Sequence, residues 1–140
     1  MNDPILHSTA SAQLIVGPGD LASALPLEAQ DAFPGVLATA RLVALMEIAS
    51  ARLLRPHLGP GELSVGVNVE VTHTAPTPPG AHVTATARYL GREGKLFVFE
   101  VVASDAGGEV GRARHKRAIV DAERLQNSAN RRVAATAGRS

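Results

Sequence analysis

Residues 36–54 have the sequence VLATARLVALMEIASARLL. Drawn as a helix, this stretch has apolar side chains on nearly every side and no continuous polar face, which is typical of a helix enclosed by other elements. Pro34 suits the first turn of such a helix, and Gly59-Pro60-Gly61 ends it. The pattern therefore predicts one long, enclosed helix over 36–54.

On the C-terminal side of this helix the hydrophobic pattern changes to a period of two, as in strands with one buried face. Turns rich in proline or glycine divide this region into strands at 63–73, 82–89, 95–104 and 109–120. A shorter strand is predicted before the helix at 12–16, followed by a covering loop at 20–32.

Strands connected by hairpins pair antiparallel, and a sheet with one apolar face needs a cover. The long helix is the only candidate for that cover. The sequence thus predicts a single α+β domain in which an antiparallel sheet wraps around one long central helix, the hot-dog arrangement, although other small α+β folds share this element order. We assign the domain to 1–125, with 1–11 frayed, and a polar, basic tail to 126–140.

The composition excludes several classes of function. The chain has 140 residues and a formal net charge of +1, so no strong field attracts nucleic acid or an anionic membrane. Cysteine is absent, which removes disulfides, thiol nucleophiles and Cys-zinc sites. The longest apolar run, Leu42–Met46, is too short to span a bilayer, and residues 1–20 lack a signal-peptide pattern. We expect a cytoplasmic protein without a metal.

Two polar residues are predicted in apolar surroundings. His73 shares its parity with the valines at 65, 67, 69 and 71, so strand geometry aims it at the helix-covered face. Glu47 lies in mid-helix, where a carboxylate is costly unless it is paired. The two side chains would satisfy each other, and a Glu/His pair is a general acid–base unit. The alternatives are a core histidine bonded to a backbone carbonyl and a purely structural carboxylate.

Other polar residues carry weaker signals. Thr39 lies near the helix start, where a threonine is usually a cap. His115 belongs to the basic run 112–117, which we expect on the solvated face of an edge strand. We expect His7, His57 and His82 on the surface.

Five short stretches together resemble the fluoroacetyl-CoA thioesterase family of hot-dog hydrolases. They are Phe-Pro-x-Val-x-Ala-Thr at 33–39, Leu-Met-Glu at 45–47, Gly-Pro-Gly-Glu at 59–62, Val-Thr-His-Thr at 71–74 and His-x-Arg-Ala at 115–118. The resemblance covers about Leu14 to Leu125, and it lies in the order and spacing of the stretches rather than in any one of them.

The resemblance implies an acyl-CoA thioesterase whose catalytic residues are Thr39, Glu47 and His73. It also implies a homodimer with active sites at the interface, and no cofactor besides the coenzyme A of the substrate. Substrate-binding residues would be Phe33 in the lid, Gly66 on the strand lining the substrate tunnel, and Arg117 against coenzyme A. Gln30 stands where selective family members have a second aromatic residue, which favours a broader short-chain acyl-CoA substrate range.

Two other functions fit the same elements. A hot-dog lyase would hydrate enoyl thioesters, although its usual Asp-plus-His pattern is not evident. A non-catalytic acyl-CoA-binding module would use Glu47 and His73 only to satisfy one another.

For a catalytic site, Thr39 and Glu47 are about 12 Å apart along a continuous helix and about 80° apart around it. Either the chain bends before the helix begins and brings Thr39 back, or the two residues reach one site from different protomers. A helix start near Thr39 with free N–H groups favours the second option, so we predict that each active site draws on two chains.

Overall fold

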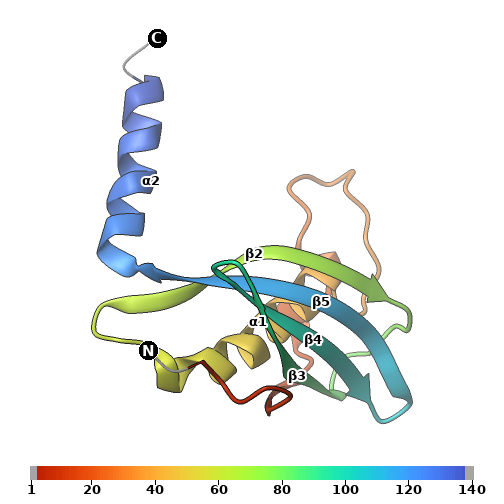
Figure 1. Ribbon diagram of the computed structural model, residues 1–140. Coiled ribbons are helices and arrows are strands. Elements are labelled where there is room, and N and C mark those ends of the chain that lie inside the picture. The colour runs from red at the N-terminus through yellow and green to blue at the C-terminus, as the bar shows by residue number, and fades with distance from the viewer. Residues whose placement is uncertain (1–2, 138–140) are drawn as a thin grey trace.

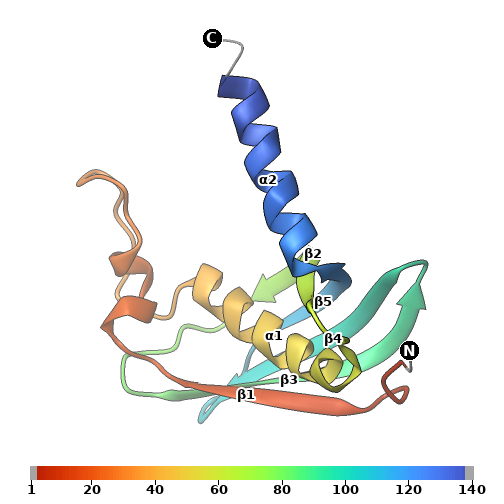
Figure 2. The same ribbon diagram turned by 90° about the vertical axis from the view of Figure 1, so that its left-hand side faces the viewer.

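A computed structural model of the chain describes residues 3–137. The described residues form a five-stranded antiparallel sheet curled around helix α1 (Thr39–Leu54), and helix α2 (Ala122–Ala137) stands away from the sheet (Figures 1 and 2). The strands are β1 (Thr9–Ile15), β2 (Glu62–His73), β3 (His82–Glu93), β4 (Leu96–Asp105) and β5 (Gly108–Asp121). The predicted α+β hot-dog architecture is confirmed.

The strand order is β1-β3-β4-β5-β2. Hairpins join β3, β4 and β5, whereas β2 pairs along the far side of β5 and leaves its own outer edge unpaired within the described chain. Leu63 and Val67 on β2 are exposed. A long edge strand with exposed apolar side chains is a template for pairing with another strand.

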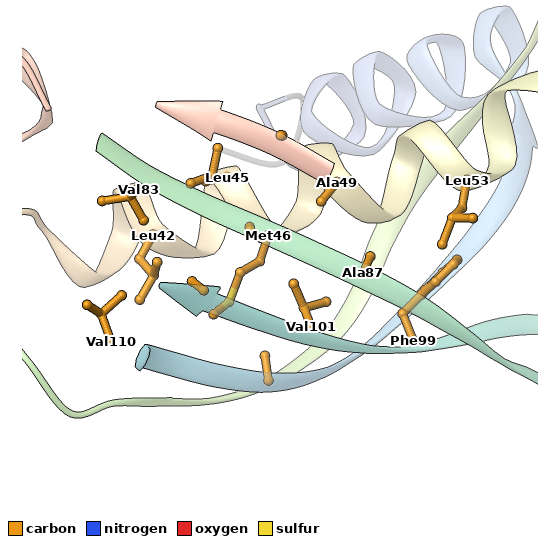
Figure 3. Packing of buried hydrophobic residues seen from close by; sticks show 14 of the residues in the cluster. Leu42, Leu45, Met46, Ala49, Leu53, Val83, Ala87, Phe99, Val101 and Val110 are labelled. Carbon is orange, nitrogen blue, oxygen red and sulfur yellow. The ribbon is translucent and has the colours of Figure 1, made fainter. Parts of the chain in front are cut away.

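The core lies between α1 and the concave face of the sheet (Figure 3). Small inward residues on β3, Ala85 and Ala87, are fully buried beneath the helix. The larger core side chains shown there are Leu42, Leu45, Met46 and Leu53 of α1 together with Val83, Phe99, Val101 and Val110 of the sheet. Burial of each such side chain contributes about 1.5–3 kcal/mol, so this contact fixes the position of α1.

The helix begins at Thr39 and not at Val36 as predicted, because the chain before it is held extended. The backbone N–H of Leu37 donates to the Thr77 carbonyl at 2.9 Å, and Leu37 also forms a β-bridge with Leu21. Pro34 therefore precedes the helix by several residues, and Thr39 is its first residue. The helix is also less enclosed than predicted, since Ile48 is 46% exposed in the single chain.

A β-bulge in β2 corrects the predicted valine stripe. Pairing with β5 shifts register between Gly66 and Asn68. Val69 and Val71 pack against the core with the parity of His73, as predicted, but beyond the bulge the parity reverses. Gly66 lies opposite buried Arg117 and faces α1, whereas Val67 is exposed.

The prediction of a solvated edge strand for the basic run is wrong. β5 is an inner strand between β4 and β2, so one of its faces is covered by α1. His115 is 1% exposed and Arg117 is 6% exposed, whereas Arg112 and Arg114 point outward. Alternation along an inner strand places half of the basic run in the interior.

The two ends of the chain are more ordered than the sequence indicates. β1 begins at Thr9, three residues before the predicted Ala12, and residues 9–11 pair with β3 rather than fraying. Residues 122–137 form α2, whose residues are exposed through residue 135 apart from partly buried Ala122; most are polar or small, and Leu125 and Val133 are exposed as well. No helix among the described residues is long and apolar enough to cross a membrane.

Candidate active site

The first cluster of functional side chains lies at the N-terminus of α1. Thr39 Oγ1 and His73 Nδ1 are 2.8 Å apart, which joins the first residue of α1 to the last residue of β2. The N-cap residue of α1 is Ala38, so Thr39 does not hold the capping position that is usual for a threonine near a helix start. A hydroxyl within hydrogen-bond reach of an imidazole is the arrangement of a nucleophile or proton donor beside a base.

The remaining ring nitrogen of His73 is unusual. His73 Nε2 is buried and has no hydrogen-bond partner within the described chain. Buried polar atoms are nearly always paired, so an unpaired imidazole nitrogen indicates a position where another group is received. Thr39 and His73 line an open cleft together with Pro34, Val36 and Leu37.

The start of α1 forms part of the wall of this cleft. The first turn of an α-helix leaves backbone N–H groups without intrahelical partners, and its end carries a partial positive charge. The N–H of Ala38 is used by the Asp20 carbonyl, which fixes the chain just before the helix. Backbone donors at a helix start are suited to stabilising negative charge on a bound group.

The second cluster is centred on Glu47, two turns further along α1. Glu47 Oε2 accepts a hydrogen bond from Arg117 Nη1 at 2.9 Å. Arg117 also donates to the Ser64 hydroxyl from Nε and to the Ser64 carbonyl from Nη2. The Glu47 side chain is 39% exposed, so a buried guanidinium holds a carboxylate that an incoming group can still reach.

This arrangement corrects the predicted mutual pairing of Glu47 and His73. Within one chain Glu47 is paired with Arg117, and His73 is paired with Thr39. Sequence analysis missed the Glu47–Arg117 pair because it assigned Arg117 to the outer face of an edge strand. The parity of Arg117 with the apolar Ala113 on β5 was the available signal for an inward position.

His115 is the functional neighbour that sequence analysis assigned to the surface. Its Nδ1 is 2.8 Å from the Asn68 carbonyl oxygen, and its Nε2 is 3.1 Å from Arg117 Nη1. Burial lowers the pKa of His115 from its ordinary value, partly offset by the hydrogen bond to the Asn68 carbonyl. His115 is thus a buried, neutral contact of the guanidinium that holds Glu47.

Gly66 is required beside Glu47 for steric reasons. A Cβ atom at this position would lie 2.5 Å from Glu47 Oε2 and 3.3 Å from His115 Cε1. Only a residue without a side chain leaves room for the carboxylate as it stands. The predicted importance of Gly66 therefore has a local cause, since Gly66 lies on β2 directly beside Glu47 and His115.

The predicted lid residues lie on a loop between η2 (Ala22–Ala24) and α1, which projects from the rest of the described chain near the start of α1 (Figures 1 and 2). Phe33 is about half exposed and directly precedes Pro34 of the cleft wall, and Gln30 is exposed. Among the described residues no group of three or more His, Cys, Asp or Glu side chains could hold a metal ion.

A five-stranded antiparallel sheet curled around one central helix defines the hot-dog class of fold. The family model described as fluoroacetyl-CoA-specific thioesterase (FlK) matches residues 21–123. The chain belongs to this family, and it is an acyl-CoA thioester hydrolase by homology.

Individual relatives agree with this assignment. The fluoroacetyl-CoA thioesterase of Streptantibioticus cattleyicolor is 45% identical over 93 residues, which are 66% of this chain and 67% of the relative. A solved structure of the fluoroacetyl-CoA thioesterase FlK has a TM-score of 0.87 and 35% identity, covering 93% of this chain and 98% of that one. A thioesterase superfamily member from Thermus thermophilus has a TM-score of 0.86 at 26% identity over the full length of both chains.

Two glycine substitutions separate the site from the core. Gly66→Ala pushes against the flexible end of Glu47, so we expect wild-type stability and a fall in thioester hydrolysis of about a hundredfold, because small misplacements of catalytic groups are costly. Gly111→Ala is the contrasting variant, since its Cβ would lie 2.9 Å from Leu42 Cδ2 and 3.0 Å from the Thr72 carbonyl oxygen. It should lower the free energy of unfolding by about 1–3 kcal/mol in urea titrations. Wild-type turnover by Gly66→Ala would contradict the role of the Glu47 position.

Proposed function

We propose that this protein hydrolyses short-chain acyl-CoA thioesters, fluorinated ones among them, to the free acid and coenzyme A, with Thr39, Glu47 and His73 as catalytic residues. The observation that carries this proposal is the 2.8 Å contact between Thr39 Oγ1 and His73 Nδ1 at the start of α1, in a chain of this thioesterase family. Relatives have been crystallised with fluoroacetate and coenzyme A, and with acetyl-CoA.

The reaction adds an oxygen nucleophile to the thioester carbonyl and then breaks the C–S bond. The negative charge on the carbonyl oxygen is stabilised by N–H groups at the start of α1, and the departing sulfur takes up a proton. Two routes use the same side chains: water activated by Glu47 and His73, or attack by one of the side chains to form an acyl-enzyme that water then cleaves. In the water route Thr39 orients the reacting group, and the proton that Glu47 and His73 take from the water is returned to the departing sulfur.

The separation of the two clusters supports an active site shared by two chains. His73 is the last residue of β2, and Gly66, which lies beside Glu47, is on the same strand. The outer edge of β2 is unpaired within the described chain. Antiparallel pairing of two β2 edges, with position 73 opposite position 66 of the partner, would bring Thr39 and His73 of one chain to Glu47 of the other. We therefore propose a homodimer with two composite sites.

The structure favours different roles for the proposed binding residues. Phe33 stands on the projecting loop at the cleft and, with Gln30 in place of a second aromatic residue, supports an acyl range broader than fluoroacetyl. Arg117 is buried and its donors are occupied by Glu47, Ser64 and His115, which does not suit a coenzyme A phosphate. We assign Arg117 to holding Glu47 in place.

A panel of short, fluorinated and aromatic acyl-CoAs tests the activity directly. We expect release of free thiol from the short acyl-CoAs, fluoroacetyl-CoA included, and slower release from the aromatic ones. Enoyl-CoA absorbance is followed in parallel, since its loss by hydration would identify a lyase. Tight binding of acyl-CoA without thiol release would contradict the hydrolase proposal and favour a non-catalytic acyl-CoA-binding module.

Substitution of the second cluster and of the base tests the catalytic assignment. Glu47→Gln and His73→Ala should each lower kcat by at least about a hundredfold, the lower range for a general acid–base group. Because Glu47 and His73 act as one unit, the kcat of the double variant should be little lower than that of the less active single variant. Glu70→Gln and His82→Ala, on exposed faces of β2 and β3, are the matched controls. Turnover near wild type by either folded site variant would end the assignment.

Mixing inactive homodimers tests the composite site. If Thr39→Ala and Glu47→Gln each abolish activity, heterodimers regain one intact site. Statistical exchange should then restore up to about a quarter of wild-type activity. Mass spectrometry of the mixture verifies that subunits exchange. No recovery in an exchanged sample would mean that all three residues act within one chain.

A further inference from the structure

We infer that His115 is a positioning residue of the active site: its unprotonated Nε2 fixes the Arg117 guanidinium, which in turn fixes Glu47. The inference extends the proposed function, because it depends on Glu47 being catalytic. His115 itself lies behind Arg117 and contacts no part of the cleft at Thr39.

The hydrogen bonds determine the tautomer of His115. The Asn68 carbonyl oxygen has no proton to give, so the nitrogen 2.8 Å from it, Nδ1, carries the hydrogen. The other nitrogen, Nε2, lies 3.1 Å from Arg117 Nη1, which is always protonated and only donates. Nε2 therefore accepts, and His115 is neutral in the folded protein.

The contacts of Arg117 show why this acceptor matters. Nε and Nη2 bond to Ser64, and the two hydrogens of Nη1 go to Glu47 Oε2 and to His115 Nε2. The bonds to Ser64 at one edge of the guanidinium and to Glu47 and His115 at Nη1 thus fix its orientation. Without the acceptor at 115, a buried N–H of Nη1 loses its partner and the guanidinium is free to turn toward other acceptors, carrying Glu47 with it.

The imidazole is packed closely by its neighbours. Its ring lies at a tilt against Phe99, with centroids 6.4 Å apart, and a Cβ at Gly66 would lie 3.3 Å from its Cε1 atom. The charged groups that act on it are Arg117 of its own strand and Glu47 of α1. A protonated His115 would place a second cation against Arg117 and remove its acceptor, so the site works only with the neutral ring.

Two substitutions keep different halves of the imidazole. His115→Gln retains an oxygen near Nε2 that accepts from Arg117, whereas His115→Asn retains only a donor toward the Asn68 carbonyl. We expect His115→Gln to keep kcat within about threefold of wild type and His115→Asn to lower it by about ten- to a hundredfold at similar KM. The midpoint temperature of thermal unfolding should fall by a similar amount in both variants. His82→Gln, on the exposed face of β3, is the control. Equal kcat in the two variants would reduce His115 to a purely structural role.

A double variant and a spectroscopic measurement separate this inference from the proposed function. Adding His115→Asn to Glu47→Gln should cause no further loss of kcat. Full activity of Glu47→Gln alone would contradict the catalytic role of Glu47, and thus the proposed function rather than the His115 contact. Long-range ¹H–¹⁵N spectra should show His115 as the neutral Nδ1–H tautomer at pH 6.5, the ordinary pKa of a histidine side chain. A charged ring or the Nε2–H tautomer at that pH would overturn the positioning role whatever the activity.

Discussion

The packing of α1 into the concave face of the sheet is the contact on which the other features depend. Small residues on β3 let the helix approach closely, and large apolar side chains of β4 and β5 surround it. Because the helix is fixed in rotation by this contact, its remaining positions are fixed as well. Thr39 is brought to His73 at one end, and Glu47 is brought to Arg117 in the middle.

The bulge in β2 is the second geometric requirement. An uninterrupted strand would direct Val67 at the middle of α1, with no room for the Glu47 carboxylate. The extra residue reverses the parity, so that Gly66 faces the helix instead and Ser64 is available to bind Arg117. The same segment supplies the Asn68 carbonyl that fixes the His115 ring. A local irregularity of one residue thus creates the polar half of the site inside an otherwise apolar core.

The two clusters differ in physical character. Thr39 and His73 lie at an open cleft, with one imidazole nitrogen unpaired, whereas Glu47 is held by a network of buried donors and acceptors. The first is suited to receive a substrate, and the second is suited to hold a carboxylate in one orientation. Each cluster contacts a residue of β2, whose outer edge is unpaired within the described chain, and an unpaired edge strand can pair with another strand.

Sequence periodicity alone predicted the long helix, the four strands after it and the inward direction of His73, because these depend on residues close together in the chain. The resemblance supplied Thr39, Glu47 and His73 as a set. The partners of these residues were decided by tertiary structure. Arg117 is buried because β5 is an inner strand, and strand order depends on pairing between segments about fifty residues apart. Thr39 begins the helix because Leu37 is tied to Thr77. Neither constraint leaves a local pattern in the sequence, since each arises from a contact between distant parts of the chain.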